Sequence, residues 1–164
     1  RVNQMMKVSS HGIALIMNFE GLRTAAYKPV SSEKGWTIGY GHHGPDVNEH
    51  SICTELEAER LLKLDLEKVE RQITAALNAD KIKVTQGMFD ALCSLLFNLS
   101  GKRTKDGRQL TPIQTLISYK LWAKMKKGDK YGASLEFLDI NKAGGVVLQG
   151  LTKRRQAEQK LFLS

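Results

Sequence analysis

Hydrophobic side chains recur at helical spacing near the start of the 164-residue chain. Ile13, Ile16 and Met17 stand three and four positions apart, and the next position on the same helix face is Glu20. Ser10 is a suitable N-cap for this helix. Because burial of an ionised carboxylate is costly, we expect Glu20 either to pair with a cation or to keep its proton, as a general acid must. The alternative is a solvated glutamate at a frayed helix end.

The segment from Trp36 to His42 combines large side chains with Thr37 and two glycines. We predict a strand here and a turn at residues 44–46, and glycines inside a strand indicate that something approaches the backbone closely. The irregular stretch before the strand makes this region a small hairpin-bearing lobe that is not stable alone. An acid beside a glycine-bearing strand with Thr and aromatic side chains suggests a cleft that cleaves glycans.

The remaining two-thirds of the chain is predicted to be a bundle of helices. Thr54 and Glu57 form a capping box that opens the longest helix, residues 55–77, whose mixed charges we interpret as a solvated face. The segment after Thr85 is apolar on all sides, which predicts a central buried helix that ends at residues 100–101. Further helices are predicted at 112–125, 131–138 and 152–163, the last preceded by a loop that Gly144, Gly145 and Gly150 bound. The predicted fold class is α+β, mostly α.

The last helix places an arginine on its apolar face. Leu151, Arg154, Ala157 and Leu161 share one side of that helix, so we expect Arg154 to point inward, with Arg155 as the alternative within the error of the helix phase. An inward arginine cannot lose its charge and needs an anion. That anion would be Glu20.

Composition and charge narrow the possible partners. Apolar residues make up 41% and charged residues 26% of the chain, as in ordinary globular proteins, but the formal net charge is +8. Such a charge suits a nucleic acid, an anionic membrane surface or an acidic polymer, and we expect no nucleic acid because the chain carries no nucleic-acid-binding motif. The basic residues, which suit an anionic cell envelope, are Lys102, Arg103, Lys105, Arg108, Lys124, Lys126 and Lys127.

Cysteine, histidine and the N-terminal segment supply further expectations. Cys53 and Cys93 make no disulfide framework, and Cys93 lies in an apolar run, where it is expected to be a small buried hydrophobe. His43 and His50 have no metal-ligand spacing, so we expect no metal and no cofactor. The N-terminal residues lack the apolar core of a signal peptide, and no apolar run predicts membrane insertion. The chain begins at Arg1 rather than Met, which fits a piece trimmed from something longer.

Two motifs together resemble a known family. The segments EGLRTAAY and GWTIGYGH are similar to the signature of the phage-type lysozymes of glycoside hydrolase family 24, and the LLFNLS run and the closing GLTKRRQAEQKLF resemble helices of that family. The resemblance implies a two-lobed lysozyme-like fold and a monomer. Its small β lobe would span about residues 21–53, its connecting helix 54–78, and its helical lobe 1–20 and 79–164.

The resemblance also implies an activity and roles for particular residues. The reaction would be hydrolysis of the β-1,4 bond between N-acetylmuramic acid and N-acetylglucosamine in peptidoglycan. Glu20 would be the general acid, Thr37 would help to position the attacking water, and Arg154 would support the acid. We further expect substrate contacts from Tyr27, Tyr40, His42 and Asn98. For His42 the favoured alternative is a structural histidine that braces the hairpin, and for Asn98 it is a polar group at a helix end.

The chain departs from the family at one position. The family usually has Asp or Cys nine residues after the acid and six before the threonine, and here these positions are Pro29 and Ser31 because the loop is two residues longer. A glycosidase needs a second group to activate water or stabilise the oxocarbenium-like state. Glu33 is our preferred candidate and Asp46 the competitor, while a solvated Glu33 beside Lys34 is the alternative reading of that loop.

Three functions are consistent with these residues. The leading hypothesis is a muramidase of phage or prophage origin, made in the bacterial cytoplasm without a visible signal peptide and active on the cell wall. A lytic transglycosylase needs only one acid, and an inactive lysozyme-like module could bind wall glycan. A basic nucleic-acid binder would explain the charge but not the two motifs.

Overall fold

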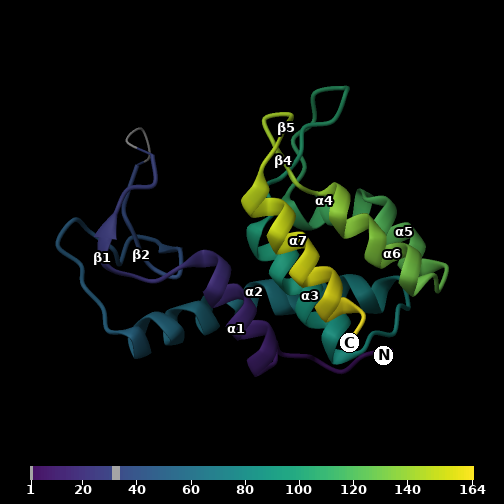
Figure 1. Ribbon diagram of the computed structural model, residues 1–164, viewed down its shortest axis with the longest axis horizontal. Coiled ribbons are helices and arrows are strands. Elements are labelled where there is room, and N and C mark those ends of the chain that lie inside the picture. The colour runs from purple at the N-terminus through teal and green to yellow at the C-terminus, as the bar shows by residue number, and fades with distance from the viewer. Residues whose placement is uncertain (1, 31–33) are drawn as a thin grey trace. The chain divides into compact units, whose positions relative to one another are not determined.

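The computed structural model describes residues 2–30 and 34–164 (Figure 1). Its contacts divide the chain into two compact units. We call residues 13–68 the β unit, and residues up to 12 together with 69–164 the helical unit. Two helices, α1 (Ser10–Glu20) and α2 (Glu55–Ala79), contribute residues to both. Whether α2 acts as the joint between two lobes stays a prediction.

The β unit contains a small antiparallel sheet. Its strands are β1 (Arg23–Tyr27), β2 (Thr37–Gly39) and β3 (His42–His43), in the order β1-β2-β3. The register pairs Tyr27 with Thr37 and Ile38 with His42. The buried hydrophobic residues of the unit come from α1, the sheet, the following loop and α2: Ile13, Ile16, Ile38, Tyr40, Val47, Ala58, Leu62 and Leu66.

The predicted single strand from Trp36 to His42 is wrong in part, because the chain reverses inside it. Tyr40 and Gly41 form a turn between β2 and β3. Gly39 and Gly41 have φ angles of +67° and +89°, which L-residues with side chains rarely adopt. A Cβ at Gly39 would also lie 3.2 Å from the Cβ of Ala58 on α2. The close approach expected at these glycines is therefore real, and one of them lets a helix pack against the turn.

The helical unit is built around α3 (Gln86–Asn98), which packs beside α7 (Gln149–Phe162) (Figure 1). Thr85 caps α3 by accepting a hydrogen bond from the backbone N–H of Met88, as predicted. Residues on all sides of α3 are buried, which confirms the central helix. Other helices surround it: α4 (Pro112–Ser118), α5 (Lys120–Lys126), α6 (Lys130–Glu136) and the 3-10 turn η1 (Phe137–Asp139).

The predicted helix over 112–125 is wrong as one element, since it breaks at Tyr119. The ψ angle of Tyr119 is 153°, so its backbone is extended between α4 and α5. Near the end of α4, the hydroxyls of Thr115 and Ser118 donate to the carbonyls of Thr111 and Thr115 at 2.9 and 2.6 Å. Such hydroxyls compete with the helical ladder, which favours an end at this point.

The predicted loop before the last helix is a second hairpin. Strands β4 (Lys142–Ala143) and β5 (Val146–Val147) pair antiparallel around Gly144 and Gly145, whose φ angles are +57° and +80°. Two glycines with positive φ suit the tight turns of two-residue hairpins. The strands are too short to show a pattern in the sequence, and α7 begins at Gln149 rather than at residue 152.

The first turn of α2 and its charged face depart in detail from expectation. The N–H of Glu57 donates to Thr54 Oγ1 at 3.1 Å as predicted, but the Glu57 carboxylate accepts the Thr54 hydroxyl at 3.0 Å. The charged face is not solvated throughout, because Glu70 is buried. Its carboxylate accepts the backbone N–H of Val8 at 2.7 Å and so ties the N-terminal segment to α2 within the helical unit.

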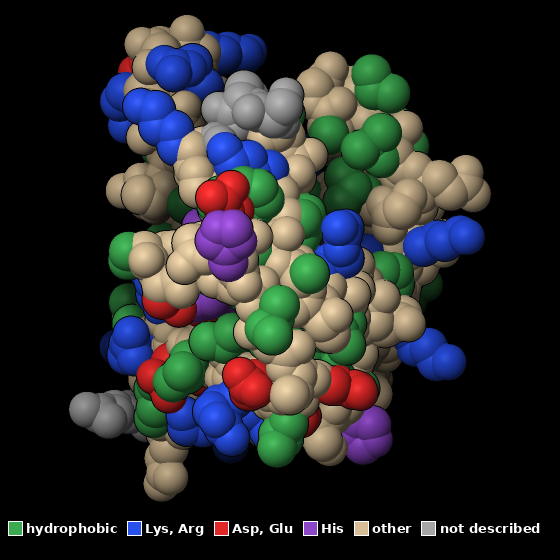
Figure 2. Space-filling model, turned by 90° about the vertical axis from the view of Figure 1, so that its left-hand side faces the viewer, with side chains coloured by type: hydrophobic (Ala, Val, Ile, Leu, Met, Phe, Trp, Pro, Cys, Tyr) green, Lys and Arg blue, Asp and Glu red, His purple; other side chains and the backbone are tan. Residues whose placement is uncertain are grey.

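Cationic side chains gather on the surface (Figure 2), whereas one of the two cysteines is buried. Figure 2 shows Lys and Arg side chains gathered at the top of the face in view. Cys53 is partly exposed, whereas Cys93 is fully buried as expected, and burial raises the pKa of the Cys93 thiol. Within the part of the chain that is described, no helix combines the length and apolarity needed to cross a bilayer, and no cluster of His, Cys, Asp and Glu could hold a metal ion.

Candidate active site

The β unit contains a pocket of about 580 Å³ that brings together three of the predicted site residues. Glu20 ends α1, Tyr27 ends β1, and Thr37 begins β2. The described residues that line it are Glu20, Tyr27, Pro29, Lys34, Gly35, Trp36, Thr37, Gly41, His43 and Gly44. The two sequence motifs therefore meet at one hollow, and the acid is among the residues that line it.

Glu20 is held at the pocket by the way its helix ends. Gly21 has a φ of +74°, and its N–H donates to the carbonyl of Met17 at 3.0 Å, which closes the helix immediately after the carboxylate. On the opposite side, a Cβ at Gly41 would lie 3.4 Å from Glu20 Oε1. The glycine turn between β2 and β3 thus passes close to the carboxylate.

Thr37 is fixed by the sheet. It is buried, and it pairs with Tyr27 of β1 on one side and with His43 of β3 on the other. Neighbouring Trp36 lines the same pocket, and the Lys28 ammonium lies 5.1 Å from the centre of its ring. Sugar-sized pockets are often lined by aromatic side chains with a few fixed polar groups, and this one has both.

Three lining residues with polar or aromatic side chains were not among the predicted site residues: Lys34, Trp36 and His43. Trp36 belongs to the GWTIGYGH motif and His43 follows it directly, so an aromatic and an imidazole beside a glycine-bearing strand were a usable signal. Lys34 carried no such signal, because a lysine in a loop is usually solvated.

The expectation that Tyr40 binds substrate stays a prediction, and the burial of its side chain does not support it. Its side chain is only 5% exposed and does not line the pocket, because the turn at residues 40–41 directs it into the interior of the β unit. Burial, and then the charges of Glu55 and Glu59, raise the pKa of Tyr40. Tyr40 is a core residue.

His42 fits the bracing alternative. Its Nε2 lies 2.9 Å from Asp46, and its Nδ1 lies 2.9 Å from Asp65 on α2, so both ring nitrogens are engaged by carboxylates. Burial opposes protonation of the ring, but the hydrogen bonds and charges of the two carboxylates outweigh it and raise the pKa of His42. The histidine fastens the hairpin to the helix and is not among the residues that line the pocket.

Of the two candidates for a second catalytic group, Asp46 belongs to the described part of the chain. Glu33 and Ser31 lie outside the described residues. The hydrogen bond from His42 lowers the pKa of Asp46, and this carboxylate does not line the pocket. Pro29, which stands at the family's carboxylate spacing from the acid, does line it and offers no catalytic side chain.

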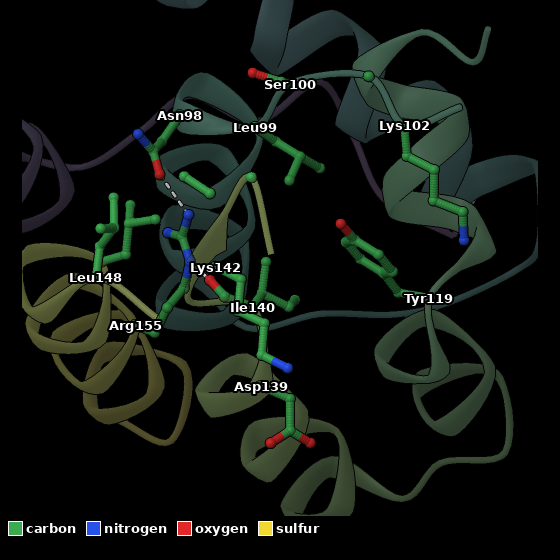
Figure 3. Close-up of a pocket in the computed structure, with 14 residues that line it drawn as sticks. Asn98, Leu99, Ser100, Lys102, Tyr119, Asp139, Ile140, Lys142, Leu148 and Arg155 are labelled. Atoms are coloured by element: carbon green, nitrogen blue, oxygen red, sulfur yellow. Dashed lines mark hydrogen bonds between the residues drawn. The ribbon is translucent and has the colours of Figure 1, made fainter. Parts of the chain in front are cut away.

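A second pocket, of about 720 Å³, lies in the helical unit between the end of α3, β4 and α7 (Figure 3). Asn98 lines it, and its side-chain oxygen accepts a hydrogen bond from Arg155 Nη2. Figure 3 shows the Asn98 amide nitrogen turned away from Arg155. Arg155 Nε donates to the carbonyl of Ile140 at 2.8 Å, so the guanidinium is anchored on two sides. The expected contact between Asn98 and an N-acetyl sugar stays a prediction.

Arg154 points inward as predicted, and so does Arg155: they are 4% and 2% exposed. The sequence missed the anion that they share on their own helix. Glu158 is fully buried, with Oε1 2.5 Å from Arg155 Nη1 and Oε2 3.3 Å from Arg154 Nε. Ser94 of α3 donates its hydroxyl to the same Oε2 at 2.5 Å. That Glu20 pairs with Arg154 stays a prediction.

These features define the class of protein: a mostly helical α+β chain of the lysozyme type, with a carboxylate at the end of a helix beside a glycine-turn sheet. The model of the phage lysozyme family matches residues 17–158. The chain belongs to that family, as the two motifs indicated, and the predicted fold class is confirmed.

Individual relatives agree with this assignment. The endolysin of Bacillus phage B103 is 42% identical over 159 residues, which are 97% of this chain and 55% of that protein. The endolysin of Acyrthosiphon pisum secondary endosymbiont phage 1 is 38% identical and covers 97% of this chain and 99% of its own length. The solved muramidase domain of SpmX from Asticaccaulis excentricus is 30% identical, with a TM-score of 0.77 over 96% of this chain and 98% of the domain. The chain thus spans about half the length of the Bacillus phage relative and nearly all of the other two.

Proposed function

We propose that this chain is a muramidase that hydrolyses the β-1,4 bond between N-acetylmuramic acid and N-acetylglucosamine of bacterial peptidoglycan. It would be made in the host cytoplasm and act on the cell wall in phage or prophage lysis. The observation that carries this proposal is the pocket that joins Glu20, Thr37 and Trp36. The names of the similar proteins, endolysins and a muramidase domain, support it.

The proposed chemistry follows from the position of each side chain. Glu20 donates its proton to the oxygen of the leaving sugar, and the nearby backbone of Gly41 limits where the carboxyl can turn. Thr37, immobilised in the sheet, positions the attacking water. Tyr27 and Trp36 provide aromatic surfaces for the sugar rings. Glu33 is the proposed base, Asn98 contacts an N-acetyl group, and Arg154 supports the acid.

The test compares wild type with Glu20→Gln in a turbidity assay on purified peptidoglycan. The amide keeps the volume of the side chain but cannot deliver a proton, so activity should fall by roughly 10²–10³-fold. Glu55→Gln, an exposed residue in the first turn of α2, is the matched control and should keep full activity. A folded Glu20→Gln variant that retains more than a tenth of the wild-type rate would refute the assignment.

A lytic transglycosylase is the second candidate, and one observation favours it: among the described residues that line the pocket, Glu20 is the one carboxylate. Such an enzyme closes an anhydro-muramic ring instead of adding water. Mass analysis of the products separates the two, because hydrolysis leaves a reducing end. If Glu33 is the base of a hydrolase, Glu33→Gln should slow turnover by more than tenfold.

A further inference from the structure

Two hairpins of the helical unit project from its helices in the same direction (Figure 1). The basic hairpin, residues 101–110, connects α3 to α4, and the apolar hairpin, residues 141–148, connects η1 to α7. Lys102 of the first and Lys142 of the second line the same pocket, so the bases of the hairpins are neighbours (Figure 3). Neither hairpin takes part in the proposed hydrolysis.

The basic hairpin is an ordered carrier of positive charge. Backbone hydrogen bonds from Leu110 N–H to the Lys102 carbonyl, 2.9 Å, and from Thr104 N–H to the Arg108 carbonyl, 2.8 Å, hold its two sides together. Four exposed cations and one carboxylate, a net charge of +3, stand on it: Lys102, Arg103, Lys105, Arg108 and Asp106.

The apolar hairpin exposes hydrophobic side chains in an unbroken run. Val146, Val147 and Leu148 are 62%, 55% and 43% exposed, and Lys142 is paired with Val147 across the turn. Single exposed hydrophobic residues are ordinary, but three in succession on a projecting turn are unfavourable in water unless something covers them. The same end of the helical unit therefore presents a cationic surface and an apolar surface next to each other.

A lipid bilayer with anionic headgroups matches both surfaces at once. Lysine and arginine are attracted to headgroup phosphates, and short apolar side chains gain free energy at the boundary of the acyl chains. A soluble wall polyanion would account for the cations but not for the exposed valines. We propose that the two hairpins dock the chain reversibly on an anionic lipid surface, by adsorption and without a membrane-spanning segment.

Co-sedimentation of the full chain with lipid vesicles tests this. Vesicles that contain phosphatidylglycerol should bind the chain, and pure phosphatidylcholine vesicles should bind it much more weakly. Replacing Lys102 and Lys105 with Gln should weaken binding roughly thirty-fold, about fivefold for each cation. Val146→Thr with Val147→Thr keeps the shape and β propensity of the hairpin, and should weaken binding roughly fivefold. Thermal melting verifies that each variant remains folded.

The matched control removes the same charge elsewhere. Lys83 and Lys160 are exposed residues of the helical unit outside both hairpins, so the variant with Gln at both positions should bind vesicles nearly as well as wild type. The proposal is overturned if phosphatidylglycerol vesicles do not bind the chain, or if this control loses as much affinity as the hairpin lysines. It is also overturned if the valine variant binds vesicles as tightly as wild type while the lysine variant binds purified wall more weakly than wild type. None of these readings depends on hydrolysis, so they stand apart from the proposed activity.

Discussion

Replacing Glu158 with Gln tests the buried charge network that joins α7 to α3. The carboxylate is fully buried and contacts two guanidinium groups, Arg154 at 3.3 Å and Arg155 at 2.5 Å, as well as the hydroxyl of Ser94 at 2.5 Å. The substitution keeps the size of the side chain and removes its charge. Two buried cations then lose a carboxylate that stabilises both.

The expected loss of unfolding free energy is large because the carboxylate and both guanidinium groups are buried. Breaking one partner of a buried ion pair typically costs about 3–5 kcal/mol, whereas an exposed pair contributes below about 1 kcal/mol. The glutamine amide can still form hydrogen bonds, so we expect the lower end, about 3 kcal/mol, and a Tm lower by roughly 6–12 °C. Glu59→Gln is the matched control, since the half-buried Glu59 lies 3.8 Å from the exposed Lys63 on α2 and should change stability by less than about 0.5 kcal/mol.

Urea unfolding monitored by circular dichroism measures both variants. If Glu158→Gln does not fold, Ser94→Ala removes one hydrogen bond to the same carboxylate and should cost about 1–2 kcal/mol. A Glu158→Gln variant that loses less than about 1 kcal/mol would show that the network does not hold α7 in place, and the reasoning would be refuted.

Three further substitutions each test one local feature of the structure. The raised pKa of His42 means that its ion pairs with Asp46 and Asp65 stabilise the fold fully below the unfolded value of about 6.5 and are lost as pH rises through the folded value. The stability advantage of wild type over His42→Gln in urea titrations should therefore shrink across that range, and a pH-independent difference would contradict this. The buried hydroxyl of Thr74 has no hydrogen-bond partner among the described residues, so Thr74→Val should raise the unfolding free energy by about 1 kcal/mol; a loss would be inconsistent with an unsatisfied group. Gly41→Ala should cost about 1–2 kcal/mol in the same titration because of its φ of +89°, and an unchanged midpoint would exclude backbone strain.

Local chemistry made much of the helical structure predictable. The apolar spacing of Ile13 and Ile16 correctly indicated the buried face of α1, and Thr85 correctly indicated where α3 begins. These features depend on side chains within four residues of one another, so the sequence contains all of their determinants. The break at Tyr119 depends on hydroxyls that also form hydrogen bonds with residues outside the helix, since Thr115 Oγ1 accepts the N–H of Lys102 at 2.9 Å. Spacing along one helix could not reveal that contact.

The candidate site, too, was predictable from the sequence only in part. The sequence determined its residue types: an acid closing a helix, a threonine and aromatics around two glycines, and an arginine on the inner face of the last helix. Only the tertiary structure decided which side chains face the pocket. The positive φ angles of Gly39 and Gly41 reverse the chain, so the two-residue alternation of a strand stops there, and Tyr40 enters the core while Trp36 lines the pocket. Glu158 likewise gained its importance only when α7 packed against α3, because burial turns an ordinary charge spacing into a contact that the fold must satisfy.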